Sequence, residues 1–268
     1  PDGQPTYAVS YKNKPVVLSS ALGVSLKDKT ALVNHFEVTG TTTHAVNETW
    51  KPVLGEQAQI VNHYNELIVA LVQKDSKVKL NLVFRAFDEG VAFRYDFPKQ
   101  ENLNYYIISD EKTEFNLTEN NKVFWIPGDF DSNEYVYNET KFSEIDNEKL
   151  NLNNGIGVKS IPGKYTVQTP LQMKSPSGLY LNIFEAAVVN YPVMHLDANV
   201  QKYTLKANLV PNAIGDKAYL QAPCVSPWRT IMVSDDARKI VSSKMILNLN
   251  EPSIIEDTSW IKPMKYVG

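Results

Sequence analysis

The sequence predicts an all-β protein, a large β sandwich with long loops and at most one or two short helices. Three observations predict it: apolar and polar residues alternate in many short runs, turn-forming residues separate these runs, and helical periodicity is scarce. With 268 residues, of which 43% are hydrophobic and 21% charged, one domain can bury a substantial core. No repeat and no linker-like tract divides the chain, so we expect a single domain over residues 1–268.

The clearest strand signal is a β-hairpin between Val78 and Phe97. Apolar residues alternate on either side of Asp88-Glu89-Gly90, which we expect to form a three-residue loop whose glycine adopts a positive φ. Shorter alternating runs predict half-buried strands over residues 7–11, 179–183 and 245–249.

Two other segments depart from the strand pattern. Residues 234–241 begin with a serine and two acidic residues and then place apolar residues three and four apart, which predicts one short helix. Residues 142–164 are rich in asparagine and glycine, which favour turns, so we expect a long surface loop there.

Charge and motif content exclude several classes of function. Twenty-seven basic and 30 acidic residues give a net charge of -3 without a basic stripe, so we expect no nucleic-acid partner. No run approaches 18 apolar residues, so we expect no membrane span. Esterase, zinc-protease and nucleotide-binding motifs are lacking, and we expect the single Cys224 to fill a core gap. The first residue is Pro1 instead of Met, which indicates that a preceding segment has been removed.

The four tryptophans are the best candidates for sugar contacts. Each stands beside a proline, a charged residue or both, and an indole can cover the apolar face of a pyranose while neighbouring polar groups bind its hydroxyls. The alternative is that each indole anchors a loop to the core. The candidate substrate or interface residues are Trp50, Glu56, Trp125, Asp129, Trp228, Arg229, Trp260 and Lys262.

Glu185 is unusual because it ends an apolar strand on the same parity as Leu181 and Ile183. If those residues face the core, a buried carboxylate needs an arginine, a polar site on a neighbouring domain, or a metal ion. The alternative is that Glu185 lies just beyond the strand in solvent.

Eight short segments in a fixed order also carry a family resemblance over nearly the whole chain. They are ETWKPV (48–53), NHYNEL (62–67), FRAFDEGVAFRY (84–95), WIPGD (125–129), FEAA (184–187), SPWRT (226–230), LNLNEP (247–252) and DTSWIKP (257–263). Together they resemble the N-terminal domain of glycoside hydrolase family 97, a family of bacterial α-glucosidases and α-galactosidases.

The resemblance implies a galactose-mutarotase-like β super-sandwich from an enzyme exported to the periplasm of a Gram-negative bacterium. In that family a catalytic (β/α)8 barrel follows this domain, so it would begin after residue 268. The barrel carries the catalytic carboxylates and is the domain's partner, and the substrate is an α-linked oligosaccharide. We therefore expect residues 1–268 alone to be inactive.

The resemblance also gives Glu185 a role as a calcium ligand, in a site completed only when the barrel supplies the other ligands. Two positions depart from the family pattern. Phe184 stands where a histidine is common, and Leu54 stands where a tryptophan is common. The second departure could alter the wall of the sugar pocket.

Two other functions compete with this interpretation. A free-standing carbohydrate-binding module would use the same tryptophans without a partner domain. A mutarotase-like enzyme would need a histidine and a glutamate as acid and base, which only Glu185 with His63 or His195 could supply. The sequence leaves open whether the parent enzyme prefers α-glucosides or α-galactosides, and whether it inverts or retains.

Overall fold

In the computed structural model, which describes residues 2–150 and 159–265, strands dominate and form three sheets. The six-stranded sheet has the order β1 (Thr6–Tyr11), β2 (Lys14–Ala21), β9 (Glu114–Leu117), β16 (Thr204–Leu209), β15 (Met194–Asn199), β12 (Thr166–Val167). The all-β prediction is confirmed.

The largest sheet has ten strands, and a small sheet has three. The large sheet has the order β11 (Asn138–Lys141), β10 (Lys122–Trp125), β13 (Leu171–Lys174), β14 (Tyr180–Ala186), β19 (Trp228–Ser234), β7 (Gly90–Phe97), β6 (Lys79–Phe87), β5 (Ile60–Gln73), β4 (Phe36–Trp50), and β18 (Cys224–Val225) also pairs with β7. The small sheet has the order β17 (Ala218–Gln221), β8 (Tyr105–Glu111), β3 (Val24–Leu26).

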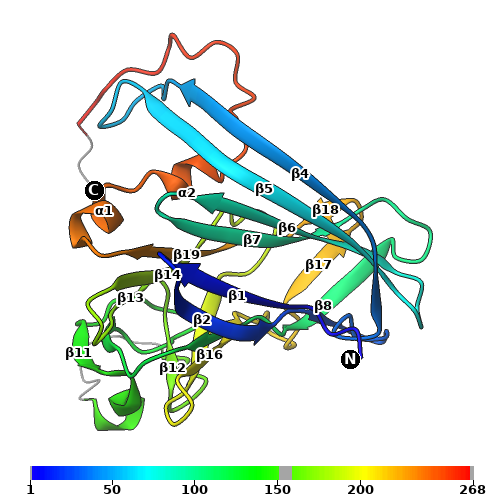
Figure 1. Cartoon of the computed structure of the whole chain (residues 1–268), viewed down its shortest axis with the longest axis horizontal. Helices are drawn as coiled ribbons and strands as arrows, with labels where there is room; N and C mark the ends of the chain where they lie inside the picture. The colour runs from blue at the N-terminus through cyan, green and yellow to red at the C-terminus, as the bar shows by residue number, and fades with distance from the viewer. Residues whose placement is uncertain (1, 151–158, 266–268) are drawn as a thin grey trace.

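The main core lies where the inner faces of these sheets meet (Figure 1). Alternate residues of each strand are buried, as in β1, where Tyr7 and Val9 point inward while their neighbours are exposed. The Tyr7 ring lies 4.7 Å from that of Phe93 on β7 and 6.5 Å from that of Phe115 on β9, measured between centroids. Apolar contacts of this kind join the six- and ten-stranded sheets into a sandwich.

The predicted hairpin between Val78 and Phe97 is formed by β6 and β7, but its turn differs from the prediction. Gly90 pairs with Phe87, so the loop has the two residues Asp88 and Glu89 and the glycine belongs to β7. A Cβ on Gly90 would come within 2.4 Å of the carbonyl oxygen of Ile231 on the neighbouring strand. Gly90 has the predicted positive φ, at +159°, and close packing against the neighbouring strand is a second reason for a glycine here.

The longest hairpin, β4–β5, extends along one side of the molecule (Figure 1). β4 is the edge of the ten-stranded sheet, and most of its residues are exposed. The sheet therefore projects beyond the sandwich core at this edge.

A second, smaller apolar cluster covers the outer face of the large sheet. Val83 and Trp228 pack there against Met245 and Leu249, which belong to the segment of α1 (Ala237–Ser242) and α2 (Met245–Asn248). The helix predicted within residues 234–241 is confirmed. The strand predicted over 245–249 is wrong: Met245 and Leu249 are four residues apart and face one side of a helical turn, while Leu247 is 47% exposed.

Residues 142–164 are only partly the surface loop that we expected. Two short 3-10 helices, η1 (Phe142–Glu144) and η2 (Asn147–Lys149), lie at its start, and Phe142 and Asn147 are buried. Asn147 donates from Nδ2 to the carbonyl oxygens of Gly163 and Thr166, which ties the two ends of the segment together. Residues 151–158 lie outside the described part. Across the described residues, no helix is long and apolar enough to cross a membrane.

Candidate functional site around Glu185

Glu185 lies near the end of β14, on the inner face that its sequence parity predicted. Leu181 and Ile183 precede it on the same face and are buried, and Glu185 itself is 4% exposed. Glu185 pairs with Arg229 of β19, whereas the pairing of β14 with β13 ends at Ile183, so the Glu185 backbone is held on the β19 side. The alternative of a solvent-exposed Glu185 is wrong.

A buried Glu185 needed an arginine, a polar site on another domain or a metal ion as its partner, and the structure shows an arginine. Arg229 stands directly opposite Glu185 in the pairing of β14 with β19, and its Nη1 donates to Glu185 Oε2 at 2.6 Å. The backbone N–H of Met194 also donates to this carboxylate, at 3.0 Å to Oε1. A charged and a neutral donor therefore fix its orientation.

Arg229 is held in turn by a second buried carboxylate, Glu111 of β8. Arg229 donates from Nε and Nη2 to the two oxygens of Glu111, at 2.9 and 2.6 Å, in a bidentate pair. The hydroxyls of Thr113 and Tyr191 donate to the same carboxylate at 2.8 and 2.9 Å. Since Arg229 is fully buried and Glu111 is 1% exposed, the guanidinium has little freedom to move.

The two carboxylates share one guanidinium but differ in acidity. Burial would raise the pKa of Glu111, but Arg229 and the hydroxyl donors hold it below its usual value. Burial raises the pKa of Glu185, and its fewer hydrogen bonds and the nearby Glu111 charge leave it above its usual value. Glu111 is therefore the fixed counter-ion of Arg229, and Glu185 is the carboxylate that an additional cation would favour in its charged form.

Glu185 borders a pocket of 620 Å³ that Asp129 and His195 also line. Asp129 is 3% exposed and accepts hydrogen bonds from Asp131 N and Ser160 N, at 2.9 and 3.0 Å. Burial opposes ionisation of Asp129, but these bonds and the Tyr135 hydroxyl lower its pKa overall. Of the predicted site residues, the structure thus brings together Glu185, Arg229 and Asp129.

His195 contributes a buried imidazole to the same pocket. Its Nε2 lies 2.8 Å from the carbonyl oxygen of Asp129, and its ring stacks on that of Phe130 at 5.6 Å between centroids. Burial lowers the pKa of His195, so the neutral ring with a proton on Nε2 fits this contact. His195 holds the Asp129 loop in place, and His63 does not line the pocket.

Two of the four tryptophans are buried within the chain. Trp125 is 1% exposed and donates from Nε1 to Thr140. Trp228 is fully buried, with the guanidinium carbons of Arg85 and Arg94 at 4.6 and 4.4 Å from its ring. Protein groups cover both indoles, so neither offers an open face to a sugar in this structure.

The remaining candidates belong to the C-terminal segment and the end of the β4–β5 hairpin. Trp50 donates from Nε1 to Asn248 at 2.8 Å, and Glu56 lies 3.5 Å from Lys244 Nζ. Lys262 and Trp260 are exposed, and Trp260 retains 67% of its surface. None of these residues lines the Glu185 pocket.

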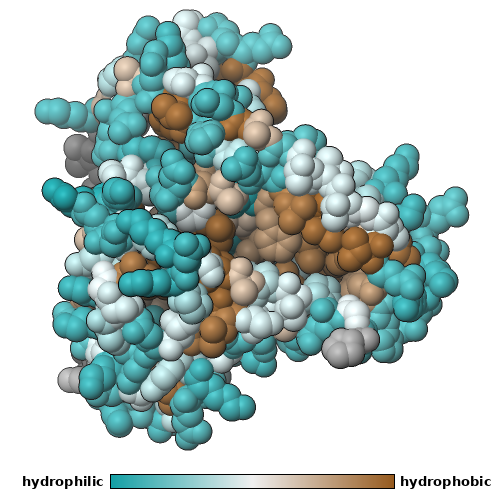
Figure 2. All heavy atoms as spheres, viewed as in Figure 1, coloured by the Kyte–Doolittle hydropathy of each residue, from teal (hydrophilic) through white to brown (hydrophobic). Residues whose placement is uncertain are grey.

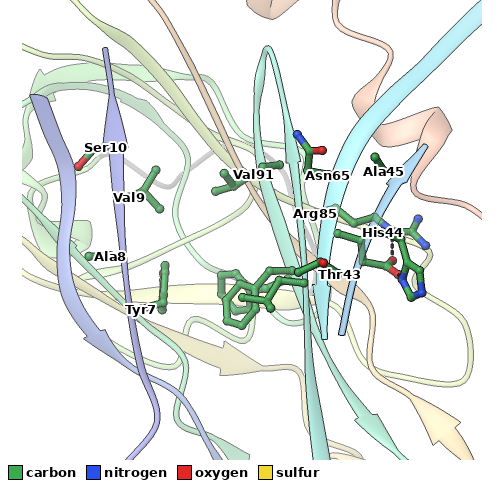
Figure 3. A pocket seen from close by; sticks show the side chains of 15 residues that line it. Tyr7, Ala8, Val9, Ser10, Thr43, His44, Ala45, Asn65, Arg85 and Val91 are labelled. Carbon is green, nitrogen blue, oxygen red and sulfur yellow. Dashed lines mark hydrogen bonds and ion pairs between the residues drawn. The ribbon is translucent and has the colours of Figure 1, made fainter. Parts of the chain in front are cut away.

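A larger groove, of 760 Å³, lies elsewhere, between β1 and strands β4 to β7. Figure 2 shows apolar atoms gathered in this hollow, and Figure 3 shows Tyr7 and Val9 pointing from β1 toward Val91. The charged groups on its rim are already paired, with Arg85 Nε 2.8 Å from Glu66 Oε2. This apolar surface suits protein contact better than chemistry on a substrate.

Sequence reasoning missed Glu111 and Tyr191, the groups that hold Arg229 in place. Glu111 lies 118 positions before Arg229, and nothing in its own strand indicates that it pairs there. Among the residues that the structure describes, no group of three His, Cys, Asp or Glu side chains is placed to hold a metal ion.

Comparison with known proteins agrees with this architecture. A retaining α-galactosidase from Bacteroides thetaiotaomicron is 22% identical, over 97% of this chain and 40% of its own length. Two structures of a glycoside hydrolase family 97 enzyme from Pseudoalteromonas sp. strain K8, a variant and an acarbose complex, are 33% identical with TM-scores of 0.84 and 0.83. They match 97% of this chain and 37% of the enzyme.

A β-arabinopyranosidase of known structure, 21% identical with a TM-score of 0.78, shares the fold over 94% of this chain and 40% of its own length. The chain thus spans well under half the length of these relatives. Residues 1–252 match the family described as glycosyl-hydrolase 97 N-terminal. The chain therefore belongs to the N-terminal domain family of the glycoside hydrolase family 97 enzymes.

Proposed function

We propose that this chain is the non-catalytic N-terminal domain of an exported enzyme that hydrolyses α-linked oligosaccharides. Family membership and the 33% identical enzyme that binds acarbose support this proposal. Glycosidases usually place two carboxyl groups on either side of the scissile bond. Glu185 and Asp129, the buried carboxylates that we placed at the pocket, are already bound by Arg229 and by backbone N–H groups. The catalytic pair would then come from a (β/α)8 barrel that packs on this domain.

Within that enzyme, Glu185 would supply one oxygen ligand to a calcium ion shared with the barrel. Calcium takes six to eight oxygen ligands and accepts carboxylates readily. Oε1 of Glu185 receives only the Met194 N–H bond, so it keeps a lone pair for a cation, and the residue lines the pocket. Within residues 2–150 and 159–265, the side chains fit a single ligand, and not a complete calcium site. When bound, the ion would polarise an oxygen of the substrate or of water.

The single observation that carries this proposal is the fixed orientation of the Glu185 carboxylate. Arg229 takes one of its oxygens, and Glu111 holds Arg229 in a bidentate pair. A buried carboxylate that served only the fold would be stabilised most by direct pairing on both oxygens. Here Arg229 contacts only Oε2, Oε1 accepts from the Met194 N–H alone, and Glu185 lines the pocket, where its carboxylate can meet a group from another domain.

The test is Glu185→Gln in the full-length enzyme, because this change keeps the shape of the side chain and removes its charge. We expect weaker calcium binding by calorimetry and a loss of kcat/KM of roughly 10- to 100-fold, with partial rescue by excess calcium. The domain alone should bind calcium with a Kd of about 10⁻³ M or weaker, since it offers one carboxylate.

Glu66→Gln is the matched control, because Glu66 is also paired with an arginine, Arg85, but lies outside the Glu185 pocket. It should leave calcium dependence unchanged. The proposal is wrong if Glu185→Gln also leaves the calcium dependence unchanged, or if the isolated domain binds calcium tightly.

A further inference from the structure

The small sheet presents two exposed tyrosines side by side on its outer face. In the pairing of β17 with β8, Tyr219 stands opposite Ile107, and Gln221 stands opposite Tyr105. Because side chains alternate along a strand, these four residues share one face. Tyr105 is 69% exposed and Tyr219 is 58% exposed, whereas their strand neighbours Tyr106 and Leu220 are buried. The two rings are diagonal neighbours with Ile107 beside them.

The Tyr219 ring is exposed yet held in place by its hydroxyl. That hydroxyl donates to Asp216 Oδ2 at 2.6 Å, and Lys27 Nζ contacts both oxygens of Asp216 at 2.8 and 2.9 Å. The hydrogen bonds from Lys27 and Tyr219 lower the pKa of Asp216, which is 5% exposed. Fixing an exposed ring costs side-chain entropy, and that cost is offset when the ring is preorganised for a ligand.

The loop that carries Asp216 is itself closed by hydrogen bonds. Asn212 Oδ1 accepts from Ile214 N and Asp216 N at 3.1 and 3.0 Å, and Asn212 N donates to the carbonyl oxygen of Asp216 at 2.8 Å. Gly215, with φ of +89°, completes the turn. The support of the Tyr219 ring therefore extends into a closed turn, and does not depend on one contact.

The groove at these tyrosines has a volume of 610 Å³, within the range of about 300 to 1,000 Å³ usual for small-molecule sites. The positive charges at this groove are neutralised. Lys27 is paired with Asp216, and Lys29 is next to Asp28 in the sequence. Gln221 adds an amide that can both donate and accept. Apolar ring faces bordered by polar groups without net charge complement a neutral polyhydroxylated ligand, and not a phosphate or a nucleic acid.

We propose that this face is a second carbohydrate-binding site, separate from the Glu185 pocket, that takes an α-linked gluco-oligosaccharide. The Tyr105 and Tyr219 rings would cover the C–H faces of successive pyranose units, while Gln221, Asp28 and Lys29 bind hydroxyls at the margin. None of the residues that line this groove lines the Glu185 pocket. The α linkage rests on the proposed function and the glucose units on the acarbose complex of the 33% identical enzyme, but the aromatic platform rests on neither. Its role would be to hold a long substrate near the enzyme.

The test compares mobility of the full-length enzyme in native gels with and without glycogen, and its titration with maltoheptaose. We expect glycogen to retard the wild type, and Tyr105→Ala or Tyr219→Ala to weaken binding about tenfold, as for loss of an aromatic anchor. Tyr219→Phe keeps the ring but loses the contact with Asp216, so it should bind between wild type and Tyr219→Ala. Tyr137→Ala is the control, because Tyr137 is also 58% exposed but lies outside this groove.

Enzyme kinetics separate this site from the catalytic one. Tyr105→Ala should lower kcat/KM for glycogen through a raised KM, and leave hydrolysis of a short p-nitrophenyl α-glucoside within about twofold of wild type. Unchanged melting temperatures would show that both variants fold. The proposal is overturned if glycogen does not retard the wild type, or if all variants are retarded equally. If the enzyme hydrolyses no α-glycoside but Tyr105→Ala still abolishes retardation, the proposed function fails and this site stands.

Discussion

Glu111 and Glu185 share the guanidinium of Arg229 but depend on it to different degrees. Glu111 has a bidentate pair and two hydroxyl donors, and its pKa is lowered. Glu185 has one nitrogen of Arg229 and one N–H group, and its pKa is raised. Removing Glu111 would leave Arg229 buried with one carboxylate that resists ionisation. The stability of this buried cluster therefore depends strongly on Glu111, a residue that the sequence pattern does not single out.

We predict that Glu111→Gln destabilises the domain by about 3 kcal/mol at pH 7, the scale for breaking a buried ion pair. A lowered folded-state pKa stabilises the domain above the unfolded pKa of about 4.3, and this contribution is lost as pH falls through the folded value. The difference between wild type and variant should therefore shrink below about pH 4. Urea denaturation at neutral and acidic pH measures it.

The wild type and the variant share the groups around position 111, which are Arg229, Tyr191 and Thr113. Glu185 titrates in both proteins. Because the Glu111 charge contributes to the raised pKa of Glu185, the variant also lowers that pKa, so the comparison reports the two coupled carboxylates together. Glu139→Gln is the control, because Glu139 is 54% exposed and pairs only with Lys122 at the surface. A Glu111→Gln penalty that stayed constant with pH would mean that lost packing, and not lost charge, is responsible.

At the scale of elements, short patterns predicted strands well but could not decide every case. The alternation over 179–183 and 78–97 became β14 and the β6–β7 hairpin. Residues 245–249 also alternate, yet Met245 and Leu249 equally fit one face of a helical turn. Contact with the cluster around Trp228 stabilises the helix there. A run of five residues carries too little periodic information to separate the two.

Gly90 offers a direct test of strand packing in the hairpin. We predict that Gly90→Ala lowers the free energy of unfolding by about 1 to 3 kcal/mol, because the new Cβ would meet Ile231 O at 2.4 Å and force the strands apart. Gly40→Ala, in β4, has nothing within 4 Å of the added Cβ and should be nearly neutral. Equal effects in thermal melts would contradict this explanation.

At the scale of the whole molecule, the sandwich is open on one side. The apolar groove between β1 and the β4–β5 hairpin exposes side chains such as Leu67, which is 38% exposed. Monomeric proteins rarely leave a large apolar surface in water, so this groove is suited to a wide protein contact, such as the one proposed with the barrel.

We predict that the isolated domain self-associates with rising concentration in sedimentation experiments, because this groove is uncovered. Leu67→Ser should weaken the association and also reduce binding of an apolar fluorescent dye. Val241→Ser is the control, since Val241 is 87% exposed but outside the groove. A single monomeric species at all concentrations would exclude the prediction.

The sequence by itself determined the all-β class and the family, because strand periodicity is local and motif order is linear, but it left open whether Glu185 faces the core or the solvent. Only the tertiary structure decided that Arg229 is the partner of Glu185, that Glu111 holds Arg229, and that Trp125 and Trp228 are covered. It also brought Tyr105 and Tyr219 onto one face from positions far apart in the chain. The parity of a strand fixes which way a side chain points. What that side chain meets depends on long-range pairing, which no local pattern records.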